Sequence, residues 1–299
     1  MRDARKALLW LATLLFVVMA GDRLLSWMLA RVLVRSQFRY SQLYRGGTNA
    51  DILIMGDSRG VNSFYAPAIE ELTGKKAFNL SYNSMSPVVA EALLLDYLDR
   101  NRPPKMVIFE PTCVMVDGAV LTELRPFATL SPRLMALYQE RHPDAARMEK
   151  IFHLLLLNTG FFVDALHYMR QSDQDWIMRG SLPETSEPEG KRVVPFLPGN
   201  REALQRIVTA LRRRGVEVRF VIAPYYAKGI ENLPQLIAGL PLDDHVRVAT
   251  YDTVFHDPAL FADHVHLNEK GSREFLAMLR RDGVLALPGE GMGGQRPRL

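Results

Sequence analysis

Short apolar runs alternate with helical stretches along this chain, and that pattern limits the folds open to it. Ile52–Met55 and Met106–Phe109 are uninterrupted apolar runs of strand length, typical of strands buried on both faces. Between them the sequence predicts a helix over Pro67–Leu72, a strand over Lys76–Leu80 and a helix over Val88–Leu98. Strands that alternate with helices are joined by right-handed crossovers and form a parallel sheet. We therefore expect an α/β fold built on a mostly parallel sheet.

The same alternation returns in the second half of the chain after a long interruption. Further helices and strands are predicted at residues 201–214, 216–226, 232–240, 246–249 and 269–281. Asn268 stands where it would cap the last of these helices. Residues 111–199 break the pattern with two helical stretches and a polar loop, and we interpret them as an insertion over one edge of the sheet. The domain is expected over residues 50–285, with a disordered tail over 286–299.

The N-terminus carries basic residues followed by an uncharged apolar run, ALLWLATLLFVVMAG. As a helix, this run covers roughly 22 Å, which is short of a hydrocarbon core of about 30 Å. It is therefore either the core of a signal peptide, with a cleavage site near Val18-Met19-Ala20, or an anchor that continues toward Leu33. Because the helical period continues without a break, we favour an uncleaved anchor over residues 1–34 and a connector over 35–49. The basic end would lie in the cytoplasm, and the domain in the periplasm of a bacterial inner membrane.

Charge and cysteine content exclude some classes of protein. The formal net charge is +4, and much of the excess lies near the two ends of the chain. No stripe of Lys and Arg interleaved with aromatic residues is present, so no nucleic-acid partner is expected. The single cysteine, Cys113, excludes a framework of intrachain disulfides.

Ser58 follows the first predicted strand directly, within the sequence GDSRG. Functional groups of an open parallel sheet gather where its strands end. A tight turn there would project the hydroxyl and leave backbone N–H groups free to stabilise an oxyanion. An ordinary serine in an ordinary turn fits the same five residues, so this motif alone does not assign a function.

Asp263 and His266 lie three residues apart just before the last predicted helix. That separation lets a carboxylate accept a hydrogen bond from the imidazole and fix its tautomer, which leaves the other ring nitrogen to face a serine. Taken singly, Asp263 fits a charge at a helix start, and His266 fits a surface or core histidine. Together with Ser58 at a strand end, the pair favours serine chemistry.

The sequence around Ser58 also fits the Gly-x-Ser-x-Gly motif of α/β-hydrolases, but that fold needs strands upstream that this chain lacks. The GDS sequence ending at Ser58 and the DHVHLN sequence beginning at Asp263 instead resemble the first and last blocks of the GDSL/SGNH hydrolase superfamily. The resemblance spans Ala50–Leu285 apart from the insertion. It implies a three-layer α/β/α sandwich of flavodoxin-like type.

The resemblance also implies roles for residues in this chain. Ser58 would be the nucleophile, His266 the general base and Asp263 the residue that orients it, while the Ser58 N–H would contribute to the oxyanion hole. The middle blocks depart from the family pattern. Ser84 stands where the family has a glycine, and the sequence FEPTCV has no asparagine where the family has one. Asn83 could substitute; otherwise the enzyme is slow, needs a partner to form the hole, or has lost catalysis.

A zinc site is an alternative interpretation of the same C-terminal region. His256, Asp257, Asp263, His264 and His266 include a His-x-His pattern with nearby carboxylates, which suits zinc. We favour the pairing of Asp263 with His266, which leaves His264 as a neighbouring polar residue. No metal and no cofactor are therefore expected.

With its N-terminal anchor, the chain is similar to membrane-tethered members of this superfamily that act in O-acylation of cell-envelope polysaccharides. The resemblance implies a serine O-acyltransferase or esterase that transfers acetyl groups of a polysaccharide through an acyl-serine intermediate. An integral-membrane acyltransferase is the expected partner and source of the acyl group. The alternative is a non-catalytic scaffold of the same fold that binds polysaccharide or a secretion complex.

Overall fold

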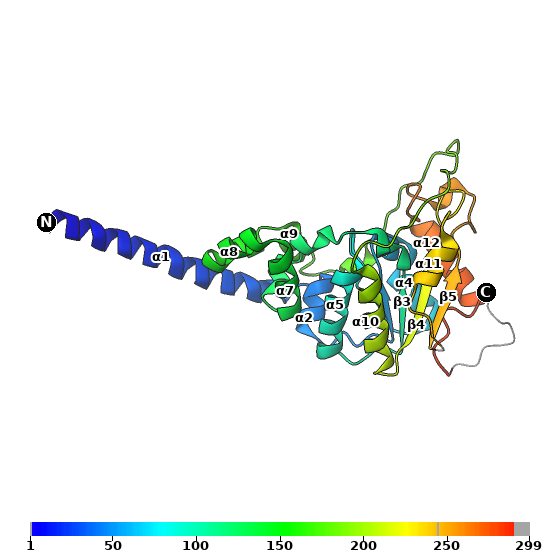
Figure 1. Cartoon of the computed structure of the whole chain (residues 1–299), viewed down its shortest axis with the longest axis horizontal. Helices are drawn as coiled ribbons and strands as arrows, with labels where there is room; N and C mark the ends of the chain where they lie inside the picture. The colour runs from blue at the N-terminus through cyan, green and yellow to red at the C-terminus, as the bar shows by residue number, and fades with distance from the viewer. Residues whose placement is uncertain (1, 244, 290–299) are drawn as a thin grey trace.

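A five-stranded, all-parallel sheet forms the centre of the protein (Figure 1). The structure is a computed structural model and describes residues 2–243 and 245–289. The strand order is β2-β1-β3-β4-β5, so the order reverses between β1 and β3. The strands are β1 (Ile52–Met55), β2 (Ala77–Asn79), β3 (Met106–Phe109), β4 (Glu217–Ile222) and β5 (Val246–Thr250). The α/β fold and the parallel sheet predicted from the sequence are confirmed.

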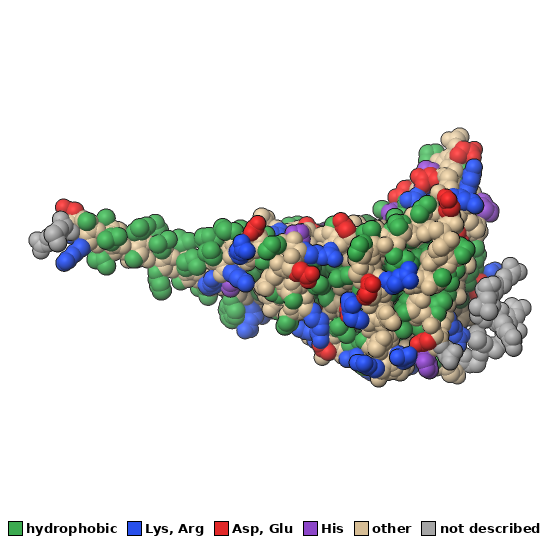
Figure 2. Space-filling view, in the orientation of Figure 1, with side chains coloured by type: hydrophobic (Ala, Val, Ile, Leu, Met, Phe, Trp, Pro, Cys, Tyr) green, Lys and Arg blue, Asp and Glu red, His purple; other side chains and the backbone are tan. Residues whose placement is uncertain are grey.

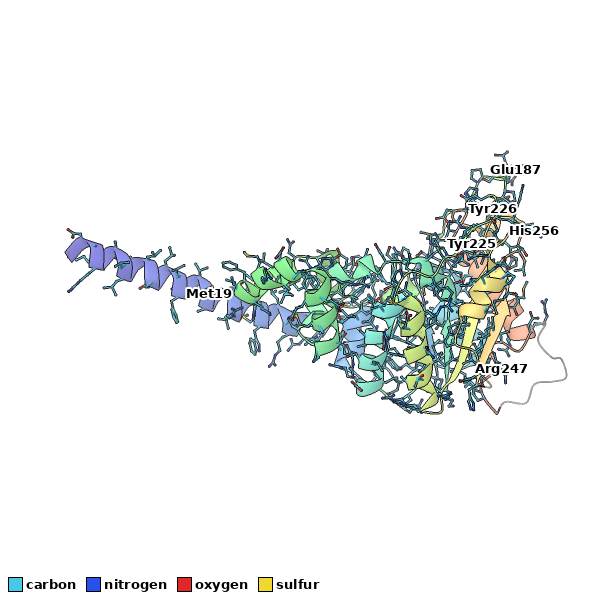
Figure 3. The ribbon with its side chains drawn as sticks, in the orientation of Figure 1. Met19, Glu187, Tyr225, Tyr226, Arg247 and His256 are labelled. Carbon is cyan, nitrogen blue, oxygen red and sulfur yellow. The ribbon has the colours of Figure 1, made fainter. Side chains whose placement is uncertain are left out.

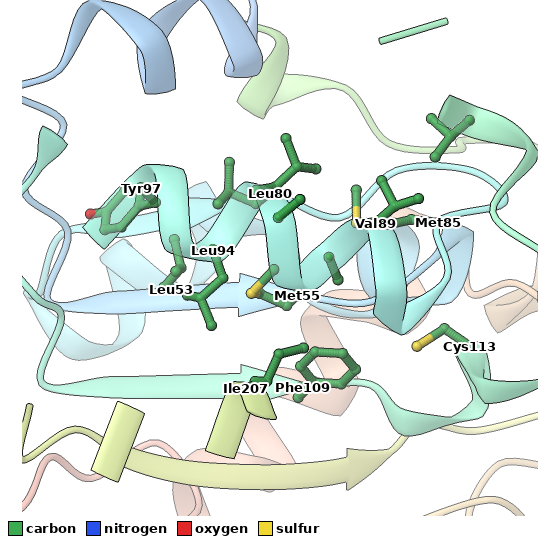
Figure 4. Close-up of a cluster of buried hydrophobic side chains, with 14 of the residues drawn as sticks. Leu53, Met55, Leu80, Met85, Val89, Leu94, Tyr97, Phe109, Cys113 and Ile207 are labelled. Atoms are coloured by element: carbon green, nitrogen blue, oxygen red, sulfur yellow. The ribbon is translucent and has the colours of Figure 1, made fainter. Parts of the chain in front are cut away.

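Helices cover both faces of this sheet because alternate strand residues point to opposite sides. Leu53, Met55 and Phe109 face a core shared with α5 (Pro87–Arg100) and α10 (Asn200–Arg212) (Figure 4). The intervening strand residues belong to a second core with α4 (Ala66–Thr73) and α12 (Glu269–Arg281); they include Ile52, Ile54, Met106 and Ile108. Full burial of one such side chain contributes about 1.5–3 kcal/mol. Two cores thus hold the sheet between two helical layers.

Residues 35–49, which we expected to be a connector, are part of the folded domain. They contain α2 (Arg39–Arg45), whose Tyr40 and Leu43 are fully buried. The polar residues that made this segment look exposed have buried partners. The Arg39 guanidinium pairs with Asp173, and the Tyr44 hydroxyl donates to Asp96 at 2.7 Å. The expectation was wrong because pairing across the fold, which local sequence does not show, satisfies these groups.

The N-terminal helix α1 (Arg2–Leu33) is unbroken and extends away from the domain (Figures 1 and 2). It is long and apolar enough to cross a membrane. At 32 residues it is about 48 Å long, well beyond the apolar run that opens it. Its last residue, Leu33, is fully buried in the domain core.

The insertion over residues 111–199 has two parts that lie in different places. Its helices α7 (Pro132–Arg141), α8 (Pro143–Ile151) and α9 (Gly160–His167) lie at the end of the domain from which α1 extends (Figure 1). The later, extended part forms bridges from Glu189 to Ala227 and from Arg192 to Ile230. That part therefore lies beside the loop that follows β4, at the carboxyl ends of the strands. Of the tail predicted over 286–299, residues 290–299 lie outside the described residues.

Candidate active site

The turn after β1 places Ser58 at the carboxyl edge of the sheet. Gly56 has φ 153°, and a Cβ there would lie 2.9 Å from the Cβ of Glu110, so the close packing of β1 on the β3 loop requires glycine. Asp57 caps α3 (Ser58–Ser63) by accepting a hydrogen bond from the N–H of Arg59 at 2.9 Å. Ser58 is therefore the first residue of a short helix.

The loop before α12 brings Asp263 and His266 to the same edge. The loop doubles back between Phe261 and Leu267, which form an antiparallel bridge. Asp263 Oδ1 accepts hydrogen bonds from the N–H groups of Val265 at 2.7 Å and His266 at 2.8 Å. These bonds fix the carboxylate against the ring of the histidine that follows it. Figure 3 shows Tyr225, Tyr226 and Glu187 at this edge, whereas Arg247 lies at the opposite edge.

Ser58, His266 and Asp263 form one connected hydrogen-bonded set. His266 Nε2 lies 2.7 Å from Ser58 Oγ, and His266 Nδ1 lies 2.9 Å and 3.0 Å from the two carboxylate oxygens of Asp263. The sequence interpretation placed these three side chains together, and the structure brings them together across 208 residues of chain. With Nδ1 protonated toward Asp263, Nε2 is the nitrogen that accepts the Ser58 proton.

The Asp263 carboxylate is held in its ionised form. Partial burial favours protonation, but the hydrogen bonds from His266 and from the N–H of Val265 outweigh it and lower the pKa of Asp263 below its usual value. An ionised carboxylate is what stabilises an imidazolium during proton transfer. The arrangement suits His266 as a general base and Asp263 as its orienting partner.

The backbone N–H groups of Ser58 and Ser84 are the candidates for stabilising an oxyanion. Ser84 adopts φ 56°, a left-handed conformation that glycine adopts more readily than serine. Within the described residues, neither the Ser58 N–H nor the Ser84 N–H has a hydrogen-bond acceptor. Asn83 is exposed in the same turn, so this loop carries the two residues, Asn83 and Ser84, that were expected to join Ser58 in the oxyanion hole.

Thr112 stands after β3, where an amide side chain was expected, and its hydroxyl contacts other side chains of the site. The Thr112 hydroxyl donates to Glu110 at 2.6 Å and accepts from Arg59 Nε at 3.1 Å. Cys113 is fully buried, and burial, with the nearby Asp57 and Glu110 carboxyls, raises the pKa of its thiol well above the usual value. Cys113 is therefore not poised as a nucleophile.

Arg59, which sequence reasoning missed, ties four segments of the site together. Its side chain is 2% exposed and donates to the carbonyls of Ala223 at 2.6 Å, Pro224 at 3.3 Å and Val265 at 2.7 Å. Its guanidinium carbon lies 3.3 Å from the ring centroid of Tyr225. Because Val265 precedes His266, this one side chain links the Ser58 turn to the histidine loop. The only signal in the sequence was the position of this arginine, in a turn that directly follows a strand expected to be buried.

Two buried carboxyl groups flank Arg59. Glu110 is fully buried and lies 3.5 Å from Arg59 Nε. Burial, reinforced by the Glu110 carboxylate, raises the pKa of Asp57 to about 7. One guanidinium therefore faces two acidic groups, and protonation of Asp57 relieves their repulsion.

A cavity of about 150 Å³ lies beside the Asn83 turn. Its lining combines aromatic rings with hydrogen-bonding side chains and includes Phe38, Arg39, Val61, Tyr82, Asn83, Asp164, Tyr168, Asp173 and Trp176. Asp173 is 2% exposed, and its Oδ1 has no hydrogen-bond partner in the part of the chain that the structure describes. Val61, which lines the cavity, lies one helical turn after Ser58 in α3.

The residues of the alternative zinc set do not converge. Asp263 holds His266, whereas His264 Nε2 lies 3.2 Å from the carbonyl of Glu187. Asp257 accepts a hydrogen bond from the N–H of Ala259. Among the described residues, no group of three His, Cys, Asp or Glu side chains is placed to hold a metal ion.

The chain was also compared with known proteins. No model of a protein family matches it, and no curated protein matches it either.

Proposed function

We propose that this chain is a membrane-anchored, exported serine O-acyltransferase or esterase of the SGNH type. The observation that carries the proposal is the 2.7 Å contact between Ser58 Oγ and a histidine that is itself braced by Asp263. A serine hydroxyl becomes a useful nucleophile when an adjacent base removes its proton, and this geometry supplies that base.

The reaction begins as His266 Nε2 takes the proton of Ser58 while Oγ bonds to the acyl carbonyl carbon. The carbonyl oxygen becomes an oxyanion that the N–H groups of Ser58 and Ser84 stabilise. Collapse breaks the ester bond, and the departing alkoxide takes the proton from His266, leaving an acyl-Ser58 intermediate. A second hydroxyl or water then gives its proton to His266 and attacks the acyl carbon. Ser58 recovers the proton as it leaves, while Asp263 stays ionised throughout.

The cavity beside Asn83 supports a sugar as the acyl acceptor. Aromatic faces such as Tyr82 and Trp176 pack against the C–H face of a sugar ring, and carboxylates accept hydrogen bonds from its hydroxyls. A cavity of about 150 Å³ is the size that admits one six-membered ring. A polysaccharide of the cell envelope is the substrate that fits an exported enzyme, and an integral-membrane acyltransferase would supply its acetyl groups.

Labelling with a serine-reactive fluorophosphonate tests the catalytic part of the proposal. The full-length chain in detergent should label, Ser58→Ala should abolish labelling, and His266→Ala should slow it by at least about 100-fold. Ser181→Ala, at an exposed serine on a surface loop, is the matched control and should label normally. A metal chelator should leave the labelling rate unchanged. A folded wild-type chain that neither labels nor hydrolyses p-nitrophenyl acetate would overturn the proposal.

One observation favours the alternative, a non-catalytic scaffold of the same fold. Thr112 stands where a side-chain donor to the oxyanion was expected, and its hydroxyl is committed to Glu110 and Arg59. Loss of one such donor costs on the order of 10²–10³ in rate. The scaffold predicts polysaccharide binding that Ser58→Ala leaves intact, with no labelling of the wild-type chain. The enzyme with a weakened hole predicts labelling that Asn83→Ala slows further if Asn83 supplies the missing donor.

A further inference from the structure

The exposed apolar side chains of the folded domain gather at the end nearest α1. Ten large hydrophobic side chains are exposed outside α1 in the described residues, and five of them lie between residues 148 and 166. We call these five the apolar tip: Met148, Ile151, Leu155, Val163 and Leu166, which are 38–64% exposed. Met148 and Ile151 share one face of α8, and Val163 and Leu166 share one face of α9, because each pair is three residues apart.

The segment that carries the apolar tip is hydrogen-bonded directly to α1. The N–H groups of His153 and Leu154 donate to the Asp22 carboxylate at 2.8 Å and 3.1 Å, and the Arg23 guanidinium donates to the carbonyl of Lys150 at 2.9 Å. Asp22 lies eleven residues before the end of the helix, so the insertion reaches back about 16 Å along α1. Figure 2 shows hydrophobic surface continuing from α1 onto the adjoining end of the domain.

The exposed apolar side chains of α1 indicate where a bilayer would lie. They run from Leu8 to Met28, a length of about 30 Å in a helix, which matches a hydrocarbon core. Trp10 and Trp27 stand near the two ends of this stretch, as interfacial aromatic residues do, and the Arg31 guanidinium lies over the Trp27 ring. On this placement Asp22 lies about 9 Å inside the outer boundary of the hydrocarbon.

A carboxylate at that depth requires shielding, and the insertion provides it. Asp22 is 7% exposed, and its two oxygens accept the two N–H groups of the segment after α8. A buried charge without such partners would be strongly unfavourable. The residues that shield Asp22 therefore lie at membrane depth with it, and the apolar tip belongs to the same short segment.

We propose that the apolar tip inserts into the membrane surface beside α1 and docks the domain on the lipid in one orientation. The basic residues Arg147 and Lys150 are exposed next to the tip and suit lipid phosphates. No flexible linker separates anchor from domain, because Leu33 is buried and α2 packs in the core. The strands run across the direction of α1 (Figure 1). With α1 spanning the bilayer, the carboxyl edge of the sheet, which carries the candidate active site, faces along the membrane surface.

Depth measurements on the full-length chain in lipid vesicles test this proposal. Single cysteines at Val163 and Leu155 are labelled with a nitroxide in vesicles of phosphatidylcholine and phosphatidylglycerol; the native Cys113 is fully buried. Leu242, which is 46% exposed but far from α1 in the chain and in the fold, is the matched control. Labels at the tip should be accessible to oxygen and protected from a water-soluble relaxation agent, whereas the Leu242 label should show the reverse.

Equal access of the water-soluble agent to all three labels would overturn the proposal. A tip that another membrane protein covers would give this same result, because the vesicles contain only lipid and this chain. Val163→Lys, added to the Leu155 label, should raise exposure to the water-soluble agent while the circular dichroism spectrum stays unchanged. A label that stays protected in this folded variant would contradict insertion. The measurement does not depend on catalysis, so repeating it in Ser58→Ala separates failure of this proposal from failure of the proposed enzymatic function.

Discussion

Replacing Arg59 with methionine tests the claim that one buried guanidinium holds the candidate site together. The substitution keeps an unbranched side chain of similar length and removes the charge and all hydrogen-bond donors. It leaves the Glu110 carboxylate buried without its cation and frees the carbonyl of Val265, next to His266. Both the stability of the fold and the position of His266 should therefore respond.

The size of the effect follows from the burial of the pair. Arg59 and Glu110 are 2% and 0% exposed, and removing one partner of a pair buried this deeply costs about 3–5 kcal/mol. Arg59→Lys should cost less, because it retains the charge. It should still be destabilising, because an ammonium cannot stack on Tyr225 and reach several carbonyls at once. Loss of the Val265 contact should also slow fluorophosphonate labelling of Ser58 under conditions in which the variant remains folded.

Chemical unfolding of the full-length chain, followed by tryptophan fluorescence, measures these costs. A double-mutant cycle with Glu110→Gln should give a coupling energy above about 1 kcal/mol, since the two side chains share one network. Arg206→Met is the matched control, because Arg206 pairs with Glu91 at 2.7 Å but is 56% exposed. That control should cost no more than about 1 kcal/mol. If Arg59→Met cost no more than Arg206→Met, the assignment of Arg59 as the link would be wrong.

Three further predictions concern the site and the anchor. The pKa of Asp57 is raised to about 7, so between about pH 4 and pH 7 the folded chain keeps a proton that the unfolded chain releases. As the pH rises through that window, the free energy of unfolding of wild type relative to Asp57→Asn should fall by up to about 1.4 kcal/mol per pH unit, and above pH 7 it should level off. Unfolding curves recorded at a series of pH values measure this difference. Gly271→Ala should destabilise the fold by at least about 2 kcal/mol in the same assay, although alanine favours helices, because its Cβ would lie 2.0 Å from the carbonyl oxygen of Leu260. A chain that begins at residue 46 lacks three fully buried apolar side chains of the α2 segment, so its free energy of unfolding should be about 5–9 kcal/mol lower than that of a chain that begins at residue 35. Because this loss is comparable to the whole stability of a domain, thermal unfolding of the shorter chain should show no cooperative transition.

Elements buried on both faces were the most predictable from sequence. The bounds of β1 and β3 match the expected runs at every residue, because a strand covered on both sides must be apolar throughout. The bounds of α12 also match, since the Asn268 side chain accepts from the N–H of Gly271 and fixes the start of the helix. The meeting of Ser58 and His266 was predictable because both follow strands or precede helices at one edge of a parallel sheet.

The features that escaped prediction depend on partners far away in the chain. Arg59 is satisfied by carbonyls more than 160 residues away, and no local pattern marks which carbonyls an arginine will reach. The α2 segment looked like a polar connector because Arg39 is charged, yet its partner, Asp173, lies in the insertion. In the sequence of either segment, a charged residue that forms a buried ion pair with a distant segment looks the same as a charged residue that is exposed to solvent.

The same ion pair connects the segment that follows α1 to the candidate oxyanion loop. Arg39 follows the end of α1 by six residues, and its guanidinium donates to the carbonyl of Ser81 as well as to Asp173. Ser81 begins the turn that carries Asn83 and Ser84, so a displacement of α2 would move the N–H group assigned to the oxyanion. A domain docked on the membrane through α1 and the apolar tip would hold α2 fixed, and so would keep that turn in place. On the proposed docking, Arg39 would link membrane attachment to the geometry of the site, because it contacts both the insertion and the carbonyl of Ser81.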